Sequence, residues 1–516
     1  MKTRPIKRKV LTLLLALCVV LSLVPVAVFA EPAAATDTAD FTVQKGTAAI
    51  ALLNQYKTDT ADSTWDNATK TLTLRGVKFT TTAQTAVKLP AGATIVLKDG
   101  TRNTIRSGDV NLEVSGAKNH TFINALDAAG SLTIEGGTGS LSVYAGALKN
   151  KGDGWVYSSG ISVDGDFTVK GGRVTARGGC AESDGSCFSF GVKMDSDTKN
   201  KALLVTGGTL TAIADEAYEL EEGGTKRASF SRGVEMFRGN VIVSGSGKLR
   251  AESVEAMAEA TVMSNGLYIS AGNLTVANSA EVAVAGAYAA YISGGSLRLD
   301  GGSLTAVSTQ TADDNGNLGC AIDMDMDLNK QVADSGSITV SGGTLETVNG
   351  DIRMSTIGAT GNQSLFTVTG GTIIGTGDKA DYKYYGNGAY STGNAFVVDT
   401  CGYPGGDPTV EIKGGTFKSE NAEAVGSYFG NTAEKALTGF ITGCSFSSDP
   451  TKYAAADYKV TTENGVFTVS KDGGNPPKTF DAGIAVYGVS AILSVTGMAW
   501  MGSKKKNTYA GKRLTK

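Results

Sequence analysis

The sequence predicts an all-β solenoid, a parallel β-helix, from three observations. First, an alternating strand, a Gly-Gly corner and a second alternating strand recur along the chain, as in residues 167–176 and 203–212. Second, a third alternating segment precedes these strands, as in residues 160–163. Third, the spacing between corners is uneven, so the extra residues must loop out of the coil. A unit of this size cannot bury its own apolar face, and it must stack on copies of itself.

The strand order is the same in the other copies. The Gly-Gly phrase returns at residues 297–306, 338–345, 366–373 and 410–417. The third segment returns at residues 191–194, 233–236, 266–269 and 321–324. Alternation with one apolar face indicates half-buried strands. In the clearest copy, the residues predicted to face inward are Ile161, Val163, Phe167, Val169, Val174 and Ala176. A barrel or a sandwich is the alternative fold, but neither explains a repeated three-strand order.

Glycine suits the corner because it adopts positive φ and has no Cβ to clash. We expect a β-branched residue at Gly171 or Gly207 to cost a few kcal/mol if φ is positive there. Residues 64–76 and 93–105 read as opening coils. Residues 441–453, with the strands that follow, read as the closing coil.

The two ends of the chain carry targeting signals. A basic start followed by an apolar run predicts a signal peptide over residues 1–30, cleaved after Ala30. Residues 31–59 form a lead-in to the β-helix, which is predicted over 60–470. Residues 482–502 are uncharged and mostly apolar, long enough to span about 30 Å of hydrocarbon as a helix. The basic tail 503–516 follows, which places the chain before the helix outside the cell.

The linker 471–481 contains Pro477, Lys478 and Thr479 just ahead of the apolar segment. This order resembles the sorting signals of Gram-positive surface proteins: a Pro-x-Thr-Gly-like motif, an apolar helix and a basic tail. The resemblance implies a sortase-type transpeptidase that cleaves after Thr479 and joins the chain to the cell wall. Phe480 stands where the common pattern has glycine, so such an enzyme needs a variant pocket. Retention by the transmembrane helix is the alternative.

Over about residues 60–475 the repeats resemble surface-displayed right-handed parallel β-helix proteins of Gram-positive bacteria. Some of these bind carbohydrate, and they are related in fold to pectate lyases. The resemblance implies a right-handed solenoid with three strands per coil, displayed on the cell surface. Its motifs are structural, and they imply no reaction.

Charge and cysteine content exclude some functions and leave others open. The net charge of −3 and the lack of a basic stripe argue against nucleic acid. The mature chain keeps five cysteines, an odd number. Cys180 and Cys187 are close enough in sequence to close a loop, whereas the others read as small buried side chains.

Hydrolases of this fold resemble one another in a paired-Asp motif, a Gly-His-Gly and an Arg-x-Lys. Here Asp313 and Asp314 form a pair, but the only histidine, His120, lies far away in sequence. The pair reads as a solvated turn, and the balance is against an enzyme. Inverting hydrolysis needs only two carboxylates, so this class stays open.

Two clusters are candidate sites. Alternation places Asp323, Asp325 and Asp327 on one face, where carboxylates suit Ca²⁺; exposed turn carboxylates are the alternative. An aromatic cluster suits sugar stacking or a protein contact; packing against the solenoid is the alternative. Its tyrosines are Tyr382, Tyr384, Tyr385, Tyr390 and Tyr403. Trp65 and Trp155 are predicted to pack near coil junctions.

These observations favour a tethered, non-catalytic surface protein whose rigid β-helix presents loops to a glycan, a host surface or a neighbouring cell. An envelope-anchored polysaccharide lyase or glycoside hydrolase is the first alternative. A stalk with no specific ligand is the second.

Overall fold

The computed structural model describes most of the repeat region. The described residues are 63–112, 120–152, 154–194, 201–219, 229–253, 262–309, 320–325, 336–354, 364–382, 384–385, 388–389, 392–400, 406–430 and 435–473. All of them belong to one compact unit, Thr36–Pro477. The signal peptide, the sorting motif and the apolar segment 482–502 lie outside the described residues. Within the part that is described, no helix is long and apolar enough to cross a membrane.

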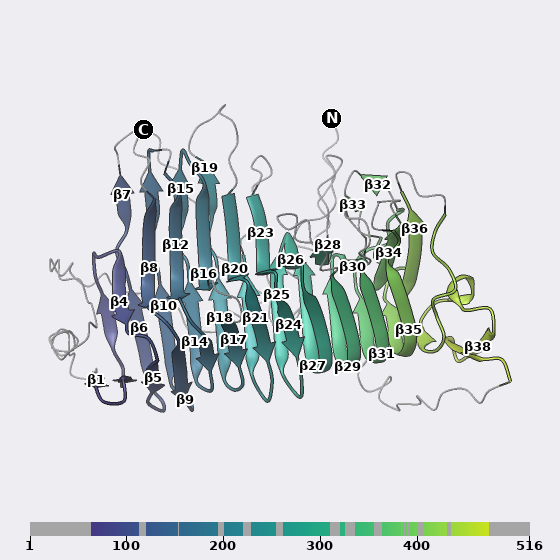
Figure 1. Ribbon diagram of the computed structural model, residues 1–516, viewed down its shortest axis with the longest axis horizontal. Helices are drawn as coiled ribbons and strands as arrows, with labels where there is room; N and C mark the ends of the chain where they lie inside the picture. Colours follow the sequence, from purple (N-terminus) through teal and green to yellow (C-terminus); the bar gives the residue numbers. More distant parts are fainter. Residues whose placement is uncertain are drawn as a thin grey trace, which may run out of the picture. The chain divides into compact units, whose positions relative to one another are not determined.

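The first sheet, sheet A, contains eleven strands, all parallel, and each pairs with its equivalent one coil further on (Figure 1). It contains the third segment of every repeat, as predicted. Its strands are β4 (Thr85–Leu89), β8 (Thr121–Ala128), β12 (Val156–Val163), β16 (Cys187–Met194), β20 (Ser229–Phe237), β23 (Val262–Ser270), β26 (Tyr288–Ser293), β28 (Cys320–Asp325), β30 (Asp351–Met354), β34 (Phe396–Thr400) and β36 (Val425–Phe429).

The second sheet, sheet B, holds the two strands on either side of each Gly-Gly corner. The strands before the corner are β2 (Thr71–Leu74), β5 (Ala93–Leu97), β9 (Leu132–Gly136), β13 (Phe167–Val169), β17 (Lys201–Val205), β21 (Gly239–Val243) and β24 (Asn273–Val276). The strands after it are β3 (Lys78–Thr80), β6 (Arg102–Arg106), β10 (Ser140–Tyr144), β14 (Arg173–Arg177), β18 (Thr209–Ile213), β22 (Lys248–Glu252) and β25 (Glu281–Gly286). In later coils one strand runs through the corner: β27 (Ser296–Ser308), β29 (Ser337–Val348), β31 (Leu365–Gly375) and β35 (Thr409–Ser419). The fold is therefore all-β with long parallel sheets, as a solenoid requires.

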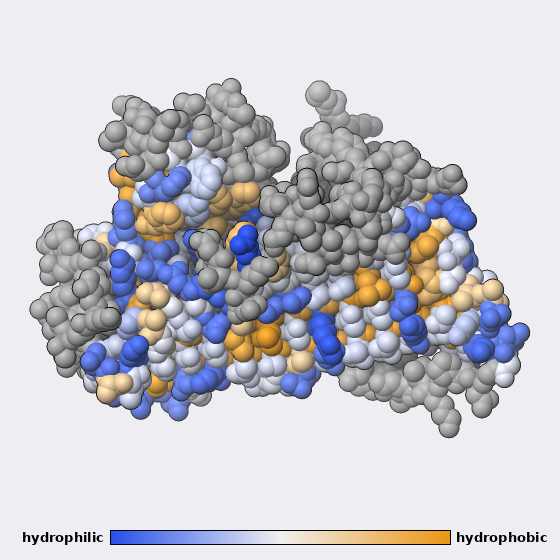
Figure 2. All heavy atoms as spheres, viewed as in Figure 1, coloured by the Kyte–Doolittle hydropathy of each residue, from blue (hydrophilic) through white to orange (hydrophobic). Residues whose placement is uncertain are grey.

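The core between the sheets consists of apolar columns. All six residues predicted to face inward, from Ile161 to Ala176, are at most 1% exposed. Phenylalanine fills the core at the later coils, where the rings of Phe366 and Phe396 stack with centroids 3.9 Å apart. Hydrophilic and hydrophobic side chains are interspersed over the lower part of the stack, where sheet B lies, as expected of a solvated face (Figure 2).

The two glycines of each corner are required for different reasons. Positive φ is considered above for Gly171 and Gly207, the first glycine of each corner, but neither residue has it. Positive φ occurs at the second glycine, +76° at Gly172 and +67° at Gly208. The first glycine is needed because a Cβ at Gly171 would collide with the carbonyl oxygen of Gly136 one coil earlier. The corner therefore excludes a side chain at both positions, by backbone strain at one and by close approach at the other.

A fourth strand, which the sequence did not predict, joins four of the coils. The strands β7 (Val110–Leu112), β11 (Leu148–Asn150), β15 (Ala181–Ser183) and β19 (Ala217–Glu219) form a small parallel sheet, sheet C. It packs on the first halves of β8, β12 and β16. The second, smaller core between them is made of Ile123, Leu148, Val156, Ala181, Cys187 and Ala217. We call this part the side lobe; Figure 1 shows β7, β15 and β19 above the level of β6, β14 and β18.

Antiparallel strands end the parallel stack on both sides. At the first coil, β1 (Ser63–Asp66) pairs antiparallel with β2. At the last coil, β37 (Ser445–Phe446) pairs antiparallel with β39 (Val466–Lys471), which forms a hairpin with β38 (Tyr458–Glu463). A single 3-10 turn, Thr451–Tyr453, is the only helical element among the residues described. Residues 93–105 lie in a parallel coil as predicted, and β37 of the closing segment continues sheet B parallel to β35, whereas residues 64–76 contain the antiparallel pair β1–β2. The antiparallel strands cover the ends of sheet B, which would otherwise be open edges.

Candidate ligand-binding surface

Four aromatic side chains lie in register on the outer face of sheet A. Strand pairing aligns Phe122 with Tyr157, Tyr157 with Phe188, and Phe188 with Phe230. The ring centroids are 4.7, 4.5 and 5.4 Å apart in that order, and each pair is stacked. We call these four residues the aromatic row. Because neighbouring strands are spaced by about the thickness of such a stack, the sheet itself holds the rings face to face.

The aromatic row is absent from the sites predicted from the sequence, although a signal exists. Tyr157, Phe188 and Phe230 each stand three residues before the glycine that opens the third segment of the repeat. That glycine marks a bend. A Cβ at Gly160 would come within 2.5 Å of the Arg177 backbone nitrogen, so sheet A passes close to sheet B there. The residues before the bend belong to the side lobe.

Trp155 extends the row at the side lobe. Its ring lies 5.1 Å from that of His120 and 6.0 Å from that of Phe188, tilted to both. The Trp155 backbone N–H donates to Nδ1 of His120 over 3.2 Å. Trp155 is 45% exposed and Phe122 44%. Trp155 thus packs against His120 and Phe188 on one side and is exposed on the other, whereas Trp65 packs against the core.

Beside the aromatic row, two positions further along the strands, lies a second row that we call the middle row. Strand pairing aligns its members in sequence. They are Asn124, Ser159, Phe190, Arg232 and Asn265. The last four are at most 7% exposed. Three of their polar atoms, Oγ of Ser159, Nε of Arg232 and Oδ1 of Asn265, are buried and have no hydrogen-bond partner in the structure.

A third row, the charged row, lies three residues beyond the middle row on the same face. It runs through Asp127, Ser162, Lys193, Glu235 and Tyr268, again aligned by strand pairing. Nη1 of Arg232 pairs with Oε2 of Glu235 at 2.6 Å. The Arg232 guanidinium lies 4.3 Å from the Phe230 centroid and 3.5 Å from the Tyr268 centroid. Aromatic rings on both sides therefore fix this arginine in place.

Lys193 and Asp127 are the other two charged side chains of the charged row. Nζ of Lys193 lies 5.8 Å from the Phe122 centroid and 5.2 Å from the Tyr157 centroid, so its side chain reaches from the charged row to the aromatic row. Burial, together with the neighbouring carboxylate of Asp164, raises the pKa of Asp127. Nδ2 of Asn124 donates to Oδ1 of Asp127 over 3.2 Å.

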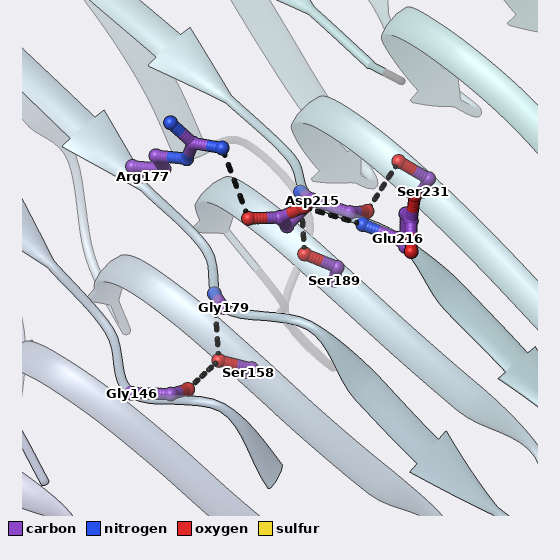
Figure 3. Close-up of polar contacts among 8 residues, drawn as sticks. All are labelled: Gly146, Ser158, Arg177, Gly179, Ser189, Asp215, Glu216 and Ser231. Atoms are coloured by element: carbon purple, nitrogen blue, oxygen red, sulfur yellow. Dashed lines mark hydrogen bonds and ion pairs between the residues drawn. The ribbon is translucent and has the colours of Figure 1, made fainter. Parts of the chain in front are cut away.

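Serines on the opposite face of the same strands anchor the bend to neighbouring loops (Figure 3). Oγ of Ser158 donates to the carbonyl oxygen of Gly146 and accepts from the N–H of Gly179, both over 2.9 Å. Ser189 accepts from the Asp215 N–H over 2.8 Å, and Ser231 donates to the Asp215 carbonyl over 2.9 Å. The carboxylate of Asp215 in turn pairs with Arg177 at 3.0 Å. These bonds hold the strands that carry the aromatic row.

The tyrosines predicted as a binding cluster are described only in part. Tyr382 stacks on Tyr428 with centroids 4.4 Å apart, and its hydroxyl donates to Oδ1 of Asp399 over 3.0 Å. Tyr382 is thus held by packing and hydrogen bonding at the edge of sheet A. The side chains of Tyr384 and Tyr385, and Tyr390 and Tyr403 as a whole, lie outside the described residues.

The predicted metal site is also described in part. Asp323 lies in β28 beside Tyr291 of β26 and is 8% exposed. The side chain of Asp325, and Asp327 as a whole, fall outside the description. Among the side chains that are described, no three His, Cys, Asp or Glu gather as metal ligands. The Ca²⁺ site stays a prediction.

Cys180 and Cys187, which are close enough in sequence to close a loop, contact different groups in the structure. Sγ of Cys187 lies 3.7 and 3.6 Å from the carbonyl oxygens of Ser183 and Gly185. Sγ of Cys180 lies 3.8 Å from a carboxylate oxygen of Glu182. Cys444 is buried as predicted, and burial raises the pKa of its thiol.

Comparison with protein-family models, with curated proteins and with solved structures found no match. The function of the chain is therefore inferred from its own geometry.

Proposed function

We propose that this chain is a non-catalytic surface protein that binds a glycan through the outer face of sheet A, on a right-handed parallel β-helix. The observation that supports this is the in-register aromatic row, together with two rings that are nearly half exposed: Phe122 at one end of the row and Trp155 beside Phe188. Scattered exposed aromatics are ordinary on a protein surface, but a continuous row beside charged and polar groups is typical of a binding site.

The row suits a sugar chain for physical reasons. Parallel strand pairing fixes the spacing of the rings before any ligand arrives, so binding costs little ordering entropy. Within the row the ring faces cover one another, which leaves ring edges, the end face of Phe122 and the tilted ring of Trp155 open to a ligand. A sugar presents C–H groups to such rings and hydroxyl groups to the polar rows beside them.

Binding of the full chain to a glycan array tests this function. We expect retention of at least one glycan, and we expect Trp155→Ala and Phe122→Ala each to weaken it about fivefold, the effect of about 1 kcal/mol per ring. Phe429 is 54% exposed and lies in β36, away from the row. Phe429→Ala is therefore the matched control and should leave binding unchanged. No retention, or equal losses in all three variants, would contradict the proposal.

We propose that the chain acts on the outer side of a Gram-positive-type envelope. The support is the apolar segment 482–502 with its basic tail, preceded by the motif Pro477–Thr479. Mass spectrometry of the wall fraction would find a C-terminus at Thr479 joined to peptidoglycan if a transpeptidase cleaves there. An intact C-terminus in the membrane fraction would favour retention by the helix instead.

A further inference from the structure

Three buried polar atoms of the middle row lack hydrogen-bond partners, and all three lie on the same face of sheet A. They are Oγ of Ser159, Nε of Arg232 and Oδ1 of Asn265. Leaving such an atom without a partner costs about 1–3 kcal/mol. Eleven such side-chain atoms occur among the described residues, and these three are the ones that strand pairing aligns in a single row. Their position between the aromatic and charged rows points to groups of a ligand that complete these bonds.

The chemistry of the three atoms selects hydroxyl groups. Nε of Arg232 is a donor, Oδ1 of Asn265 is an acceptor, and a serine hydroxyl is both. A carboxylate only accepts, so it would leave Asn265 unpaired and bring two acceptor oxygens together. A hydroxyl group donates and accepts, and a chain of sugars carries several of them along its length.

The charges of this face cancel, which argues against an acidic ligand. Across β8 to β23 the three rows hold two formal cations, Lys193 and Arg232, and two formal anions, Asp127 and Glu235. Arg232 is already paired with Glu235 at 2.6 Å. A polyanion would have to compete with Glu235 for the guanidinium, whereas a neutral oxygen can accept from Nε without disturbing the pair.

We propose that the outer face of sheet A binds a neutral glycan, whose hydroxyl groups are received by Ser159, Arg232 and Asn265 while its sugar rings contact the aromatic row. This rests on the proposed function and adds the class of ligand. Ser159 in β12 and Asn265 in β23 are three strand steps apart, about 14 Å at a strand spacing of about 4.8 Å. The ligand is therefore an oligosaccharide or polysaccharide that lies along the solenoid axis rather than a single sugar.

The Lys193 side chain lies across the path of this ligand. Its backbone is in the charged row, and its Nζ is near the Phe122 and Tyr157 rings, so the side chain crosses the middle row. Lys193 is half-buried, its side chain is flexible, and cation–π contacts are worth about 0.5–2 kcal/mol. The bound glycan displaces this side chain to reach Ser159.

Two neighbouring serines provide the test, because they predict opposite results. Ser159→Ala removes a buried hydroxyl without a partner, so the midpoint of urea unfolding should stay equal or rise. Affinity for a neutral glycan should fall about tenfold, the loss of one hydrogen bond. Ser158→Ala, the matched control, breaks two bonds on the opposite face. It should lower the unfolding midpoint and leave the affinity of the folded protein within about twofold.

Binding of the full chain is measured by calorimetry with neutral oligosaccharides of glucose, xylose, mannose and N-acetylglucosamine, and with acidic ones of galacturonate and mannuronate. We expect a neutral oligosaccharide to bind with an affinity independent of salt. Binding of acidic oligosaccharides alone, weakened by salt, would overturn the neutral class and leave the proposed glycan function standing. If no oligosaccharide binds, both the neutral ligand class and the proposed glycan-binding function are overturned. Unchanged affinity in Ser159→Ala would overturn the role of the middle row.

A second variant keeps the charge and removes one donor. Arg232→Lys retains a cation for Glu235 but has no Nε–H. We expect affinity for the neutral oligosaccharide to fall about tenfold. The exposed Arg173 on sheet B gives the same substitution away from the site, and Arg173→Lys should bind like the wild type. If the two variants bind equally well, Arg232 does not contact the ligand.

Discussion

Individual backbone positions in this solenoid are set by the coil that lies one turn away. Gly172 needs positive φ, and Gly171 needs the absence of a Cβ, because strands of successive coils approach within contact distance at the corner. A second corner, between sheets A and B, uses positive φ at Arg238, Ala271 and Gly294 in successive coils. Two of these three residues are not glycine, so this corner stores strain.

We expect Ala271→Gly to raise the free energy of unfolding by about 1 kcal/mol. Ala271 has φ of +52°, a conformation that costs an L-residue about 1–2 kcal/mol and glycine almost nothing; the greater freedom of the unfolded glycine returns part of this gain. Urea denaturation measures the change. The reverse substitution at the equivalent position one coil further on, Gly294→Ala, where φ is +65°, should lower stability by at least as much. A lower free energy of unfolding in Ala271→Gly would contradict the presence of backbone strain at Ala271.

The buried carboxyl group of Glu252 should make the free energy of unfolding depend on pH. Burial raises its pKa from 4.5 to about 7, and Arg250 offsets this only partly. The folded state then binds a proton more tightly than the unfolded state, so stability falls as pH rises from about 4.5 to 7. Glu252→Gln removes this loss. Relative to the wild type, the variant should gain up to about 3 kcal/mol above pH 7 and nothing near pH 4. Equal effects at both values of pH would contradict the assignment.

At the scale of elements, the bend in the long strands of sheet A separates two cores. Beyond Gly160, Ile161 and Val163 point into the main core; before it, Val156 points into the side lobe. Six side chains form the core of the side lobe, and none of them is larger than leucine or isoleucine. Small cores of this kind open more readily than the main stack.

We expect amides of β11 and β15 to exchange with deuterium faster than those of β13 and β14. Val156→Ala removes two buried methyl groups from the small core, at a cost of about 2 kcal/mol. It should speed exchange in sheet C further and leave β13 unchanged. Exchange mass spectrometry resolves these segments. Equal acceleration in sheet C and in β13 would mean that the two cores unfold as one unit.

The elements differ in how far the sequence predicts them. The columns around Phe167 follow from alternation and the Gly-Gly phrase, because both are local patterns. Sheet C does not, because strands of three residues such as β15 are too short to alternate measurably. The aromatic row was missed for another reason. Tyr157 and Phe188 are far apart in sequence, and only parallel pairing brings them together. The tyrosines at 382–390 are close in sequence, so they form a cluster that the sequence alone can indicate.

At the scale of the whole molecule, parallel stacking turns one residue per coil into a continuous row. A single strand of sheet A contributes at most one residue to each of the three rows, and β23 contributes only to the middle and charged rows. Pairing across β8, β12, β16, β20 and β23 multiplies these into three rows of fixed spacing. A solenoid thus builds a long face from modest repeats, and the function proposed above places the ligand contacts on the strands rather than only in the loops between them.

Hydroxyl-radical footprinting of the full chain, with and without a neutral oligosaccharide, tests the central claim most directly. It reports the solvent exposure of each aromatic ring in solution. We predict that the ligand protects Phe122, Trp155 and Tyr157 and leaves Phe429 unchanged. Protection of the tyrosines at 382–390 with no change at Phe122 and Trp155 would contradict the claim and move the binding site away from the aromatic row.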